Sequence, residues 1–342
     1  MLQTKKKLQR IGYIDIAKGI AILSVFLGHM DVPILNKIVY TFHMPLFFLI
    51  SGYFISDDDE KISSFMKRKT KHLMLAYIFT SICVVLINII RSIVLMDSNI
   101  VGRGAMLVWA AIYGSGNAWE TPYHIEPIGT IWFLMALCVA LFIVKLCINK
   151  TWGSACVVIL AYIGYKTAQF VWLPFNVQSG MTASLFVYLG YQGKKNEVLK
   201  RVNYGGLFFC LILWIFCIIF GGNLYMVRNY YGNGFLDIFG SIAASYFILN
   251  MSKFIEKHIP PLSCGLQLFG RYSMVLMCTH LIELNFMIGH IYRSIYALNC
   301  SMVFIYILLF LYKISFCTIL ILIFYKIPII NKIFFKNKSI NN

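Results

Sequence analysis

Long apolar segments recur from one end of this 342-residue chain to the other. Several approach or exceed the roughly 18 residues that are typical of a transmembrane helix. Only 13% of the residues are charged, whereas about a quarter are charged in a typical soluble domain. No polar stretch is long enough to bury a core of its own. The sequence therefore predicts an all-α, polytopic membrane helix bundle, a single integral-membrane domain over 1–342 with its embedded core at about 10–330.

The apolar segments are long and numerous enough for about ten transmembrane helices. An outer loop is expected over 96–129, where GAMLVWAAIYG is interpreted as an interfacial or re-entrant helix. The segment 180–193 is short for a crossing, so that span is expected to be tilted or broken. The expected spans lie near 12–30, 37–55, 73–95, 130–148, 154–173, 180–193, 204–221, 235–252, 265–290 and 301–325.

The net charge of +17 is distributed unevenly along the chain. Lys and Arg gather in every second loop, which is the positive-inside pattern, and this predicts that both termini are cytoplasmic. The protein is accordingly expected to be a multi-pass protein of the cell (inner or plasma) membrane. Because topology explains the basic excess, nucleic acid is not expected as a partner. The ten cysteines contain no CxxC pair, so we interpret them as packing thiols and expect no metal site.

Three polar residues share one face of the first expected span. Lys18 and His29 are eleven residues apart, which places them within about 20° of one another on a helix and about 16 Å apart along it. Asp15 lies about 40° from His29 by the same count. The alternative is that Lys18 extends its ammonium group to the membrane surface and that His29 serves only for packing. This alternative explains three polar residues on one helix face less well. Ionisable groups at membrane depth usually mark a site or a pathway.

The second span, 37–55, contains His43 and Pro45, a polar ring and a helix breaker. Pro45 has no backbone N–H and its ring crowds the carbonyl of Thr41, so a kink or opening is predicted beside His43. Such freed backbone is tolerated at membrane depth where it lines a cavity or is buried by protein. A short outer turn joins the two spans, which brings His29 and His43 to a similar depth. The alternative is a packing kink with a hydrogen-bonded histidine.

The two spans together resemble a known family. IDIAKGIAILSVFLGHM followed by TFHMPLFFLISGYFI closely resembles the opening of the acyltransferase-3 family of integral-membrane O-acyltransferases, most of all its fucose 4-O-acetylase-like and polysaccharide O-acetyltransferase branch. IWFLMAL and FGRYSMVLMCTH resemble later segments of that branch. The family often has an arginine separated from the histidine by ten intervening residues, where this chain has Lys18. It often has two arginines three apart after the second span, where Arg68 and Lys71 fit, with Ala76 at a position where proline is common.

The resemblance implies a cytoplasmic acyl-CoA donor, most often acetyl-CoA, and a hydroxyl acceptor. Cations at the cytoplasmic mouth suit the phosphates of CoA; for the run 67–71 the alternative is an ordinary positive-inside loop. We assign donor binding to Lys18, Arg68, Lys71, His72 and Arg271, with Lys69 nearby.

The expected chemistry is general-base or covalent acyl transfer by His29. His43 would orient the partner, move a proton or stabilise an oxyanion. Asp15 would pair with Lys18 or Arg68. His280 falls seven residues after Ser273, so both are expected to face one cavity or else His280 is hydrogen-bonded between helices.

Substrate contacts are assigned to residues of the second span, of the outer loop and of the IWFLMAL motif. Aromatic rings beside carboxylates suit a sugar, although an interfacial aromatic belt is the alternative explanation. The stretch FLYKISFCTILILIFY is interpreted as lipid-facing surface. The predicted carbohydrate-binding residues are Ser51, Trp119, Glu126 and Trp132.

The function expected from these features is an O-acetyltransferase that acts on a cell-surface polysaccharide or its lipid-linked precursor. A transporter or flippase of a lipid-linked sugar is the alternative, but the inverted repeats typical of transporters are not visible in the sequence. A membrane domain that only anchors or senses is the third possibility. No nucleophile elbow, zinc-ligand spacing or Walker loop is present, which argues against a soluble-type hydrolase or a nucleotide-driven enzyme. The sugar, the size of the acyl group and the oligomeric state stay open.

Overall fold

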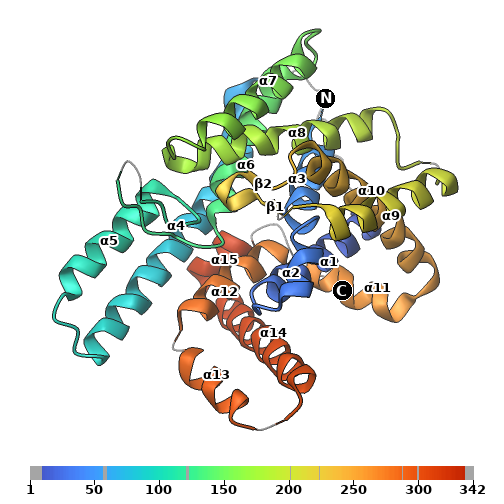
Figure 1. Ribbon diagram of the computed structural model, residues 1–342. Coiled ribbons are helices and arrows are strands. Elements are labelled where there is room, and N and C mark those ends of the chain that lie inside the picture. The colour runs from blue at the N-terminus through green and yellow to red at the C-terminus, as the bar shows by residue number, and fades with distance from the viewer. Residues whose placement is uncertain are drawn as a thin grey trace, which may run out of the picture.

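The computed structural model describes residues 10–335 except 57–59, 121–122, 201, 223, 287 and 299. It is mostly helical, as predicted, and a short antiparallel hairpin lies near the middle of the molecule (Figure 1). The helices are α1 Gly12–Gly28, α2 Pro33–Val39, α3 His43–Tyr53, α4 Ile62–Val94, α5 Ile100–Tyr113, α6 Trp132–Cys147, α7 Gly153–Thr167, α8 Val177–Lys195, α9 Tyr204–Phe220, α10 Phe235–His258, α11 Pro260–Arg271, α12 Ser273–Asn285, α13 Ile288–Tyr296, α14 Met302–Lys326 and α15 Pro328–Phe334; the strands are β1 Leu224–Tyr225 and β2 Tyr230–Tyr231.

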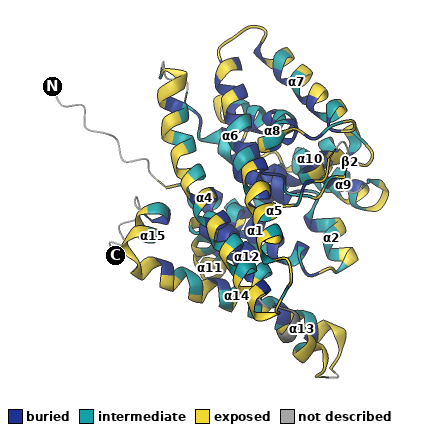
Figure 2. Ribbon diagram, turned by 90° about the vertical axis from the view of Figure 1, so that its left-hand side faces the viewer, coloured by how far each residue is buried: buried dark blue, intermediate teal, exposed yellow. Residues whose placement is uncertain are grey.

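Several helices are long and apolar enough to cross a membrane. Four qualify by length and composition among the described residues: Pro33–Tyr53, Ile62–Val94, Phe235–His258 and Met302–Lys326. Shorter apolar helices accompany them, and α9 leaves Phe208 and Phe209 each 65% exposed. In Figure 2 the exposed residues follow the outer sides of the helices while buried residues gather inside. The chain is a membrane protein; the count of about ten spans and the position of the termini stay predictions.

Helix boundaries differ from the expected spans at three places. The expected span 265–290 is divided at Tyr272 into α11 and α12. The helix α4 begins at Ile62, eleven residues before the expected span, because the basic segment 62–72 is itself helical. The segment 180–193 lies within α8, which runs without interruption, so the broken alternative is wrong and the tilt stays a prediction. The outer-loop segment forms a helix, as expected: α5, which packs against α4 (Figure 1).

Glycines allow the inner helices to approach one another at backbone distance. A Cβ added at Gly52 would lie 1.8 Å from the Val187 carbonyl oxygen, and one added at Gly190 would lie 1.8 Å from the Leu49 carbonyl oxygen. These two contacts join α3 to α8. At Gly270 an added Cβ would lie 1.7 Å from the backbone oxygen of residue 15, which joins α11 to α1. Close packing of this kind is typical of small residues between membrane helices, and it holds α1 and α3 around one interior region.

The helix α14 is two-sided, which corrects the interpretation of its sequence as lipid-facing surface. Leu309, Lys313 and Cys317 are completely buried. Val303 and Leu322 on the same helix are 70% and 59% exposed. The three buried positions follow one another at intervals of four residues, so they form one stripe that packs against α12.

Candidate active site

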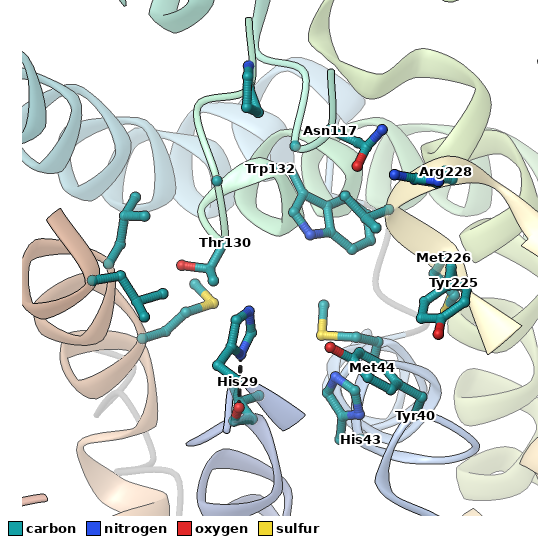
Figure 3. Close-up of a pocket in the computed structure, with 18 of the residues that line it drawn as sticks. His29, Tyr40, His43, Met44, Asn117, Thr130, Trp132, Tyr225, Met226 and Arg228 are labelled. Atoms are coloured by element: carbon teal, nitrogen blue, oxygen red, sulfur yellow. Dashed lines mark hydrogen bonds between the residues drawn. The ribbon is translucent and has the colours of Figure 1, made fainter. Parts of the chain in front are cut away.

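His29 and His43 line the same cavity, whose volume is about 570 Å³. The cavity lies between the hairpin of α1 and α3, the start of α6, the strand β1 and one side of α12 (Figure 3). Both imidazole rings point toward its centre in that view. The two histidines therefore share one cavity, and their similar depth in the membrane stays a prediction.

The His29 ring is held in one tautomer by its own helix. His29 follows the last residue of α1, and its Nδ1 lies 2.8 Å from the Val25 carbonyl oxygen. A carbonyl can only accept a hydrogen bond, so Nδ1 carries the hydrogen and donates it. The lone pair is therefore on Nε2, the other ring nitrogen. A neutral imidazole in this state can take a proton from a group in the cavity.

His43 repeats the same arrangement on the opposite wall. Its Nδ1 lies 2.6 Å from the Val39 carbonyl oxygen, so Nδ1–H donates and Nε2 carries the lone pair. His43 is buried and is the first residue of α3. In the neutral state neither cavity histidine has an Nε2–H to donate, which favours proton acceptance over stabilisation of an oxyanion at His43.

The helix is interrupted directly before His43, where the sequence predicts an opening. Residues 40–42 separate α2 from α3. The Tyr40 hydroxyl donates to the Gly28 carbonyl oxygen at 2.9 Å, and the Trp214 indole donates to the Thr41 hydroxyl at 2.8 Å. These contacts from α1 and α9 hold the interruption in place. Freed backbone thus lies beside a cavity, as membrane depth requires.

The remaining walls supply aromatic rings and hydrogen-bonding groups that the sequence analysis did not select, except for Trp132. Thr130 has a buried hydroxyl with no hydrogen-bond partner among the described residues. The Trp132 indole nitrogen faces the cavity in Figure 3. The two-residue strands and the turn between them come from a stretch rich in Tyr, Asn and Gly, which was the available signal in the sequence. The wall residues that the sequence analysis missed are Tyr40, Asn117, Thr130, Tyr225 and Arg228.

Other predicted substrate contacts lie outside the cavity wall. Trp119 stacks on Trp172 with ring centroids 4.8 Å apart. Glu126 lies 3.1 Å from His124 Nε2, and the hydrogen bond that His124 Nδ1–H donates to the Glu120 carboxylate is the main cause of the raised pKa of that exposed histidine. Ser51 donates to the Phe47 carbonyl oxygen within its own helix. The roles of Ser51, Trp119 and Glu126 in substrate binding therefore stay predictions, while Trp132 does line the cavity.

Cations gather at the opposite end of α1. Lys18 Nζ lies 2.9 Å from Asp15 Oδ1, and Arg271 Nε lies 3.8 Å from Asp15 Oδ2. This places Asp15 with the predicted donor-binding residues and about 21 Å along the helix from His29. Lys18 also lies 5.7 Å from the centre of the Phe54 ring.

A second group of cations surrounds the buried Phe65 ring, at 5.3 to 6.0 Å from its centre. Arg68 also pairs with Glu60, with Nε 3.2 Å from Oε1. Lys71 and His72 are exposed on the same helix. Two lysines that the sequence analysis did not select come from α6 and α8. We call the combined surface the basic rim; its members are Lys18, Arg68, Lys69, Lys145, Lys194 and Arg271.

His280 lies directly behind His29 and does not line the cavity. The two ring centroids are 5.1 Å apart. His280 Nδ1 lies 3.0 Å from Glu283 Oε2 on the same helix, so His280 is hydrogen-bonded within α12 and not between helices as the alternative expected. Ser273 begins α12, two turns away, and is also absent from the cavity wall.

The described residues contain no group of three or more His, Cys, Asp or Glu side chains that could hold a metal ion. The cavity therefore offers imidazole, hydroxyl and indole groups for its chemistry.

Comparison with known proteins adds one finding. A family model described as an acyltransferase domain, acyltransferase-3, matches residues 11–326. No curated protein and no solved structure matches the chain significantly.

Proposed function

The chain belongs to the acyltransferase-3 family and is a membrane acyltransferase, and on that premise we propose that it is an O-acetyltransferase. It takes an acetyl group from cytoplasmic acetyl-CoA and transfers it to a hydroxyl of a cell-surface polysaccharide or of its lipid-linked precursor. The group transferred is thus not an amino-acyl group. The enzyme lies in the cell (inner or plasma) membrane with both termini and the basic rim in the cytoplasm.

One observation carries this proposal: two neutral-tautomer histidines direct their lone pairs into one cavity lined by aromatic rings. General-base catalysis requires a base within reach of the proton that it removes. A sugar hydroxyl bound between the two rings would meet such a base on either side. Aromatic walls of the kind formed by Tyr40, Trp132 and Tyr225 suit the apolar faces of a sugar ring.

The reaction breaks the C–S bond of the thioester and forms the C–O bond of the acetyl ester. His29 Nε2 takes the proton of the acceptor hydroxyl while that oxygen attacks the carbonyl carbon of the thioester. The C–S bond then breaks, and the departing sulfur takes the proton from His29, so CoA thiol and an acetyl ester are the products. His43 accepts a hydrogen bond from a neighbouring hydroxyl of the acceptor and so orients the acceptor. The Thr130 hydroxyl and the Trp132 indole N–H are the donors available for the negative charge on the thioester oxygen.

The basic rim supports the assignment of the donor. Six cations near one end of α1 match the phosphates of CoA. Lys18 and His29 are separated by about 16 Å along α1, which is comparable with an extended pantetheine arm. Ile22 and Val25 lie between them on the same helix face and are buried, so the path offered to the thioester is apolar.

The test is acetylation of surface glycan in cells that carry each variant at matched membrane abundance. His29→Ala and His43→Ala are each expected to lower acetylation by a factor of about 100 or more, as for loss of a general base. The double variant is expected to be no worse than the more damaged single variant, because both rings act on one step. Acetylation at the wild-type level in the double variant would overturn the proposal.

His258→Ala is the matched control. His258 Nδ1 donates to the Phe254 carbonyl oxygen at 3.0 Å, which is the same backbone hydrogen bond, but the ring is exposed at the end of α10 and outside the cavity. This variant is expected to leave acetylation unchanged.

A further inference from the structure

Two opposite charges are buried together in the helical interior. Glu283 on α12 and Lys313 on α14 are both 0% exposed, and Lys313 Nζ lies 3.4 Å from Glu283 Oε2. Lys313 is about 16 Å from one end of α14 and about 20 Å from the other. A lysine at mid-helix is too deep to reach the membrane surface with its ammonium group. Residues of this kind inside a membrane protein are energetically expensive and mark a functional site by default.

Glu283 also fixes the state of His280. A carboxylate can only accept, so the 3.0 Å contact is a hydrogen bond from His280 Nδ1–H to Glu283 Oε2. Two donors, His280 Nδ1–H and Lys313 Nζ–H, therefore meet on one carboxylate oxygen. The lone pair of His280 is on Nε2, which is buried without a hydrogen-bond partner among the described residues, as is Glu283 Oε1.

His280 in turn packs on the proposed base. Its ring meets the His29 ring at 77° with centroids 5.1 Å apart, and Phe26 packs edge-on against its ring with centroids 4.6 Å apart. The Val25 carbonyl oxygen fixes one nitrogen of His29. The His280 ring is a second contact, and it limits rotation of His29 about its side-chain bonds. Contacts thus lead from Lys313 on α14 through Glu283 and His280 on α12 to His29 at the cavity wall.

We propose that Glu283, kept ionised by Lys313, is a positioning residue that acts on His29 through His280. This inference rests on the proposed function. When His29 takes the acceptor proton it becomes a cation, and the His280 ring, polarised by the carboxylate that accepts its Nδ1–H, is the group packed against that cation until the departing sulfur removes the proton. The proton of the acceptor hydroxyl ends on the sulfur of CoA, and His29 returns to its neutral tautomer. Lys313 holds the carboxylate in its charged form at a depth where a lone carboxylate would be neutral.

A purely architectural ion pair is the competing explanation. Breaking a buried pair by removing one partner leaves an unpaired charge and strongly destabilises the protein, whereas replacing both partners by uncharged groups of similar volume is often tolerated. The two explanations therefore differ in the double variant. If the pair only supports folding, Glu283→Gln with Lys313→Met restores both stability and catalysis; if Glu283 positions His29, stability returns without catalysis.

The experiment measures CoA thiol release from acetyl-CoA by the full chain in membrane vesicles that carry the native glycan. The Glu283→Gln, Lys313→Met double variant is expected to show a wild-type thermal unfolding midpoint and an unchanged KM for acetyl-CoA, with kcat at least about 10-fold lower. A wild-type kcat in this variant would overturn the inference. The control neutralises the exposed ion pair between Glu197 and Lys200, and no parameter is expected to change.

Two further variants keep the outcome decisive. His280→Asn retains an N–H donor for Glu283 but removes the ring from His29, so kcat is expected to fall while KM stays constant; an unchanged kcat would contradict the inference even if the double variant failed to accumulate. His29→Ala is measured in parallel. Wild-type activity of His29→Ala would contradict the proposed function itself. An inactive His29→Ala together with a fully active double variant would contradict only the role of Glu283.

Discussion

At the scale of single residues, backbone carbonyls decide what the two cavity histidines can do. Val25 and Val39 each accept an Nδ1–H four residues later in the chain. A free histidine exchanges between two neutral tautomers, but here the ring nitrogen that faces the cavity is an acceptor in both cases. The same side chain with its ring turned over would present a donor and could not take the acceptor proton.

Replacement of Pro45 by alanine is expected to be mild. Pro45 is the third residue of α3, and backbone N–H groups in the first turn of a helix have no partner within the helix. The interruption before His43 is held by Tyr40 and Thr41 through contacts with other helices. Surface-glycan acetylation by Pro45→Ala should stay within about threefold of wild type, a difference of about 0.7 kcal/mol. A loss as large as that of His43→Ala would show that the proline itself holds the ring in place.

At the scale of elements, α3 and α8 are joined where glycine removes a side chain from each. Their backbones meet at Gly52 against Val187 and at Gly190 against Leu49. The contact orients α3, and therefore His43, relative to the start of α6. Ser51 is next to one of these glycines and bonds within its own helix, so the small Ser–Gly pair allows the two helices to approach closely.

Two glycines one turn apart on α8 provide a matched pair of variants. Gly190→Ala places a methyl group 1.8 Å from the Leu49 carbonyl oxygen, whereas nothing lies within 4 Å of a Cβ added at Gly193. Gly190→Ala is expected to destabilise by about 1–3 kcal/mol, because the helices must separate. Gly193→Ala is expected to be neutral or to stabilise by about 0.5–1 kcal/mol. Thermal unfolding in detergent measures both; equal midpoints would show that α3 and α8 are not closely packed.

At the scale of the whole molecule, the charged and catalytic regions occupy opposite ends of one hairpin. The net charge of +17 is not spread evenly. The basic rim gathers cations from α1, α4, α6, α8 and α11, most of them beside the aromatic rings of Tyr53, Phe54 and Phe65. The cavity with His29 and His43 lies at the other end of α1 and α3. A donor held by its phosphates at one end must extend its thioester through the apolar region between them.

Binding of acetyl-CoA to the purified protein is expected to weaken as salt rises, since the rim contacts are ionic. Lys69→Gln combined with Lys145→Gln should weaken it by on the order of tenfold, about 1.4 kcal/mol, with little effect on the unfolding midpoint. Lys166→Gln is the control, because this lysine lies on α7 beside Tyr162 and Tyr165, away from the rim. Equilibrium binding of acetyl-CoA measures the salt dependence and the affinities of the double variant and the control. Equal losses of affinity in the double variant and in Lys166→Gln would assign the effect to overall charge.

The sequence by itself determined the membrane class, the helical content and the hairpin of His29 and His43. These features depend on local composition and on helical spacing within one or two adjacent segments. They do not depend on which distant segments pack together. The opening beside His43 could be predicted for the same reason, since proline acts on its own turn.

Only the tertiary structure decided which distant groups meet. His29 and His280 are separated by most of the chain, and the strand residue Tyr225 reaches the cavity from between α9 and α10. Lys313 looks like one charge in a lipid-facing helix until α14 packs its buried stripe on α12 and brings Glu283 to it. Helical periodicity states which residues share a face, but the partner of that face is set by packing between helices, and a single sequence carries no local signal for it.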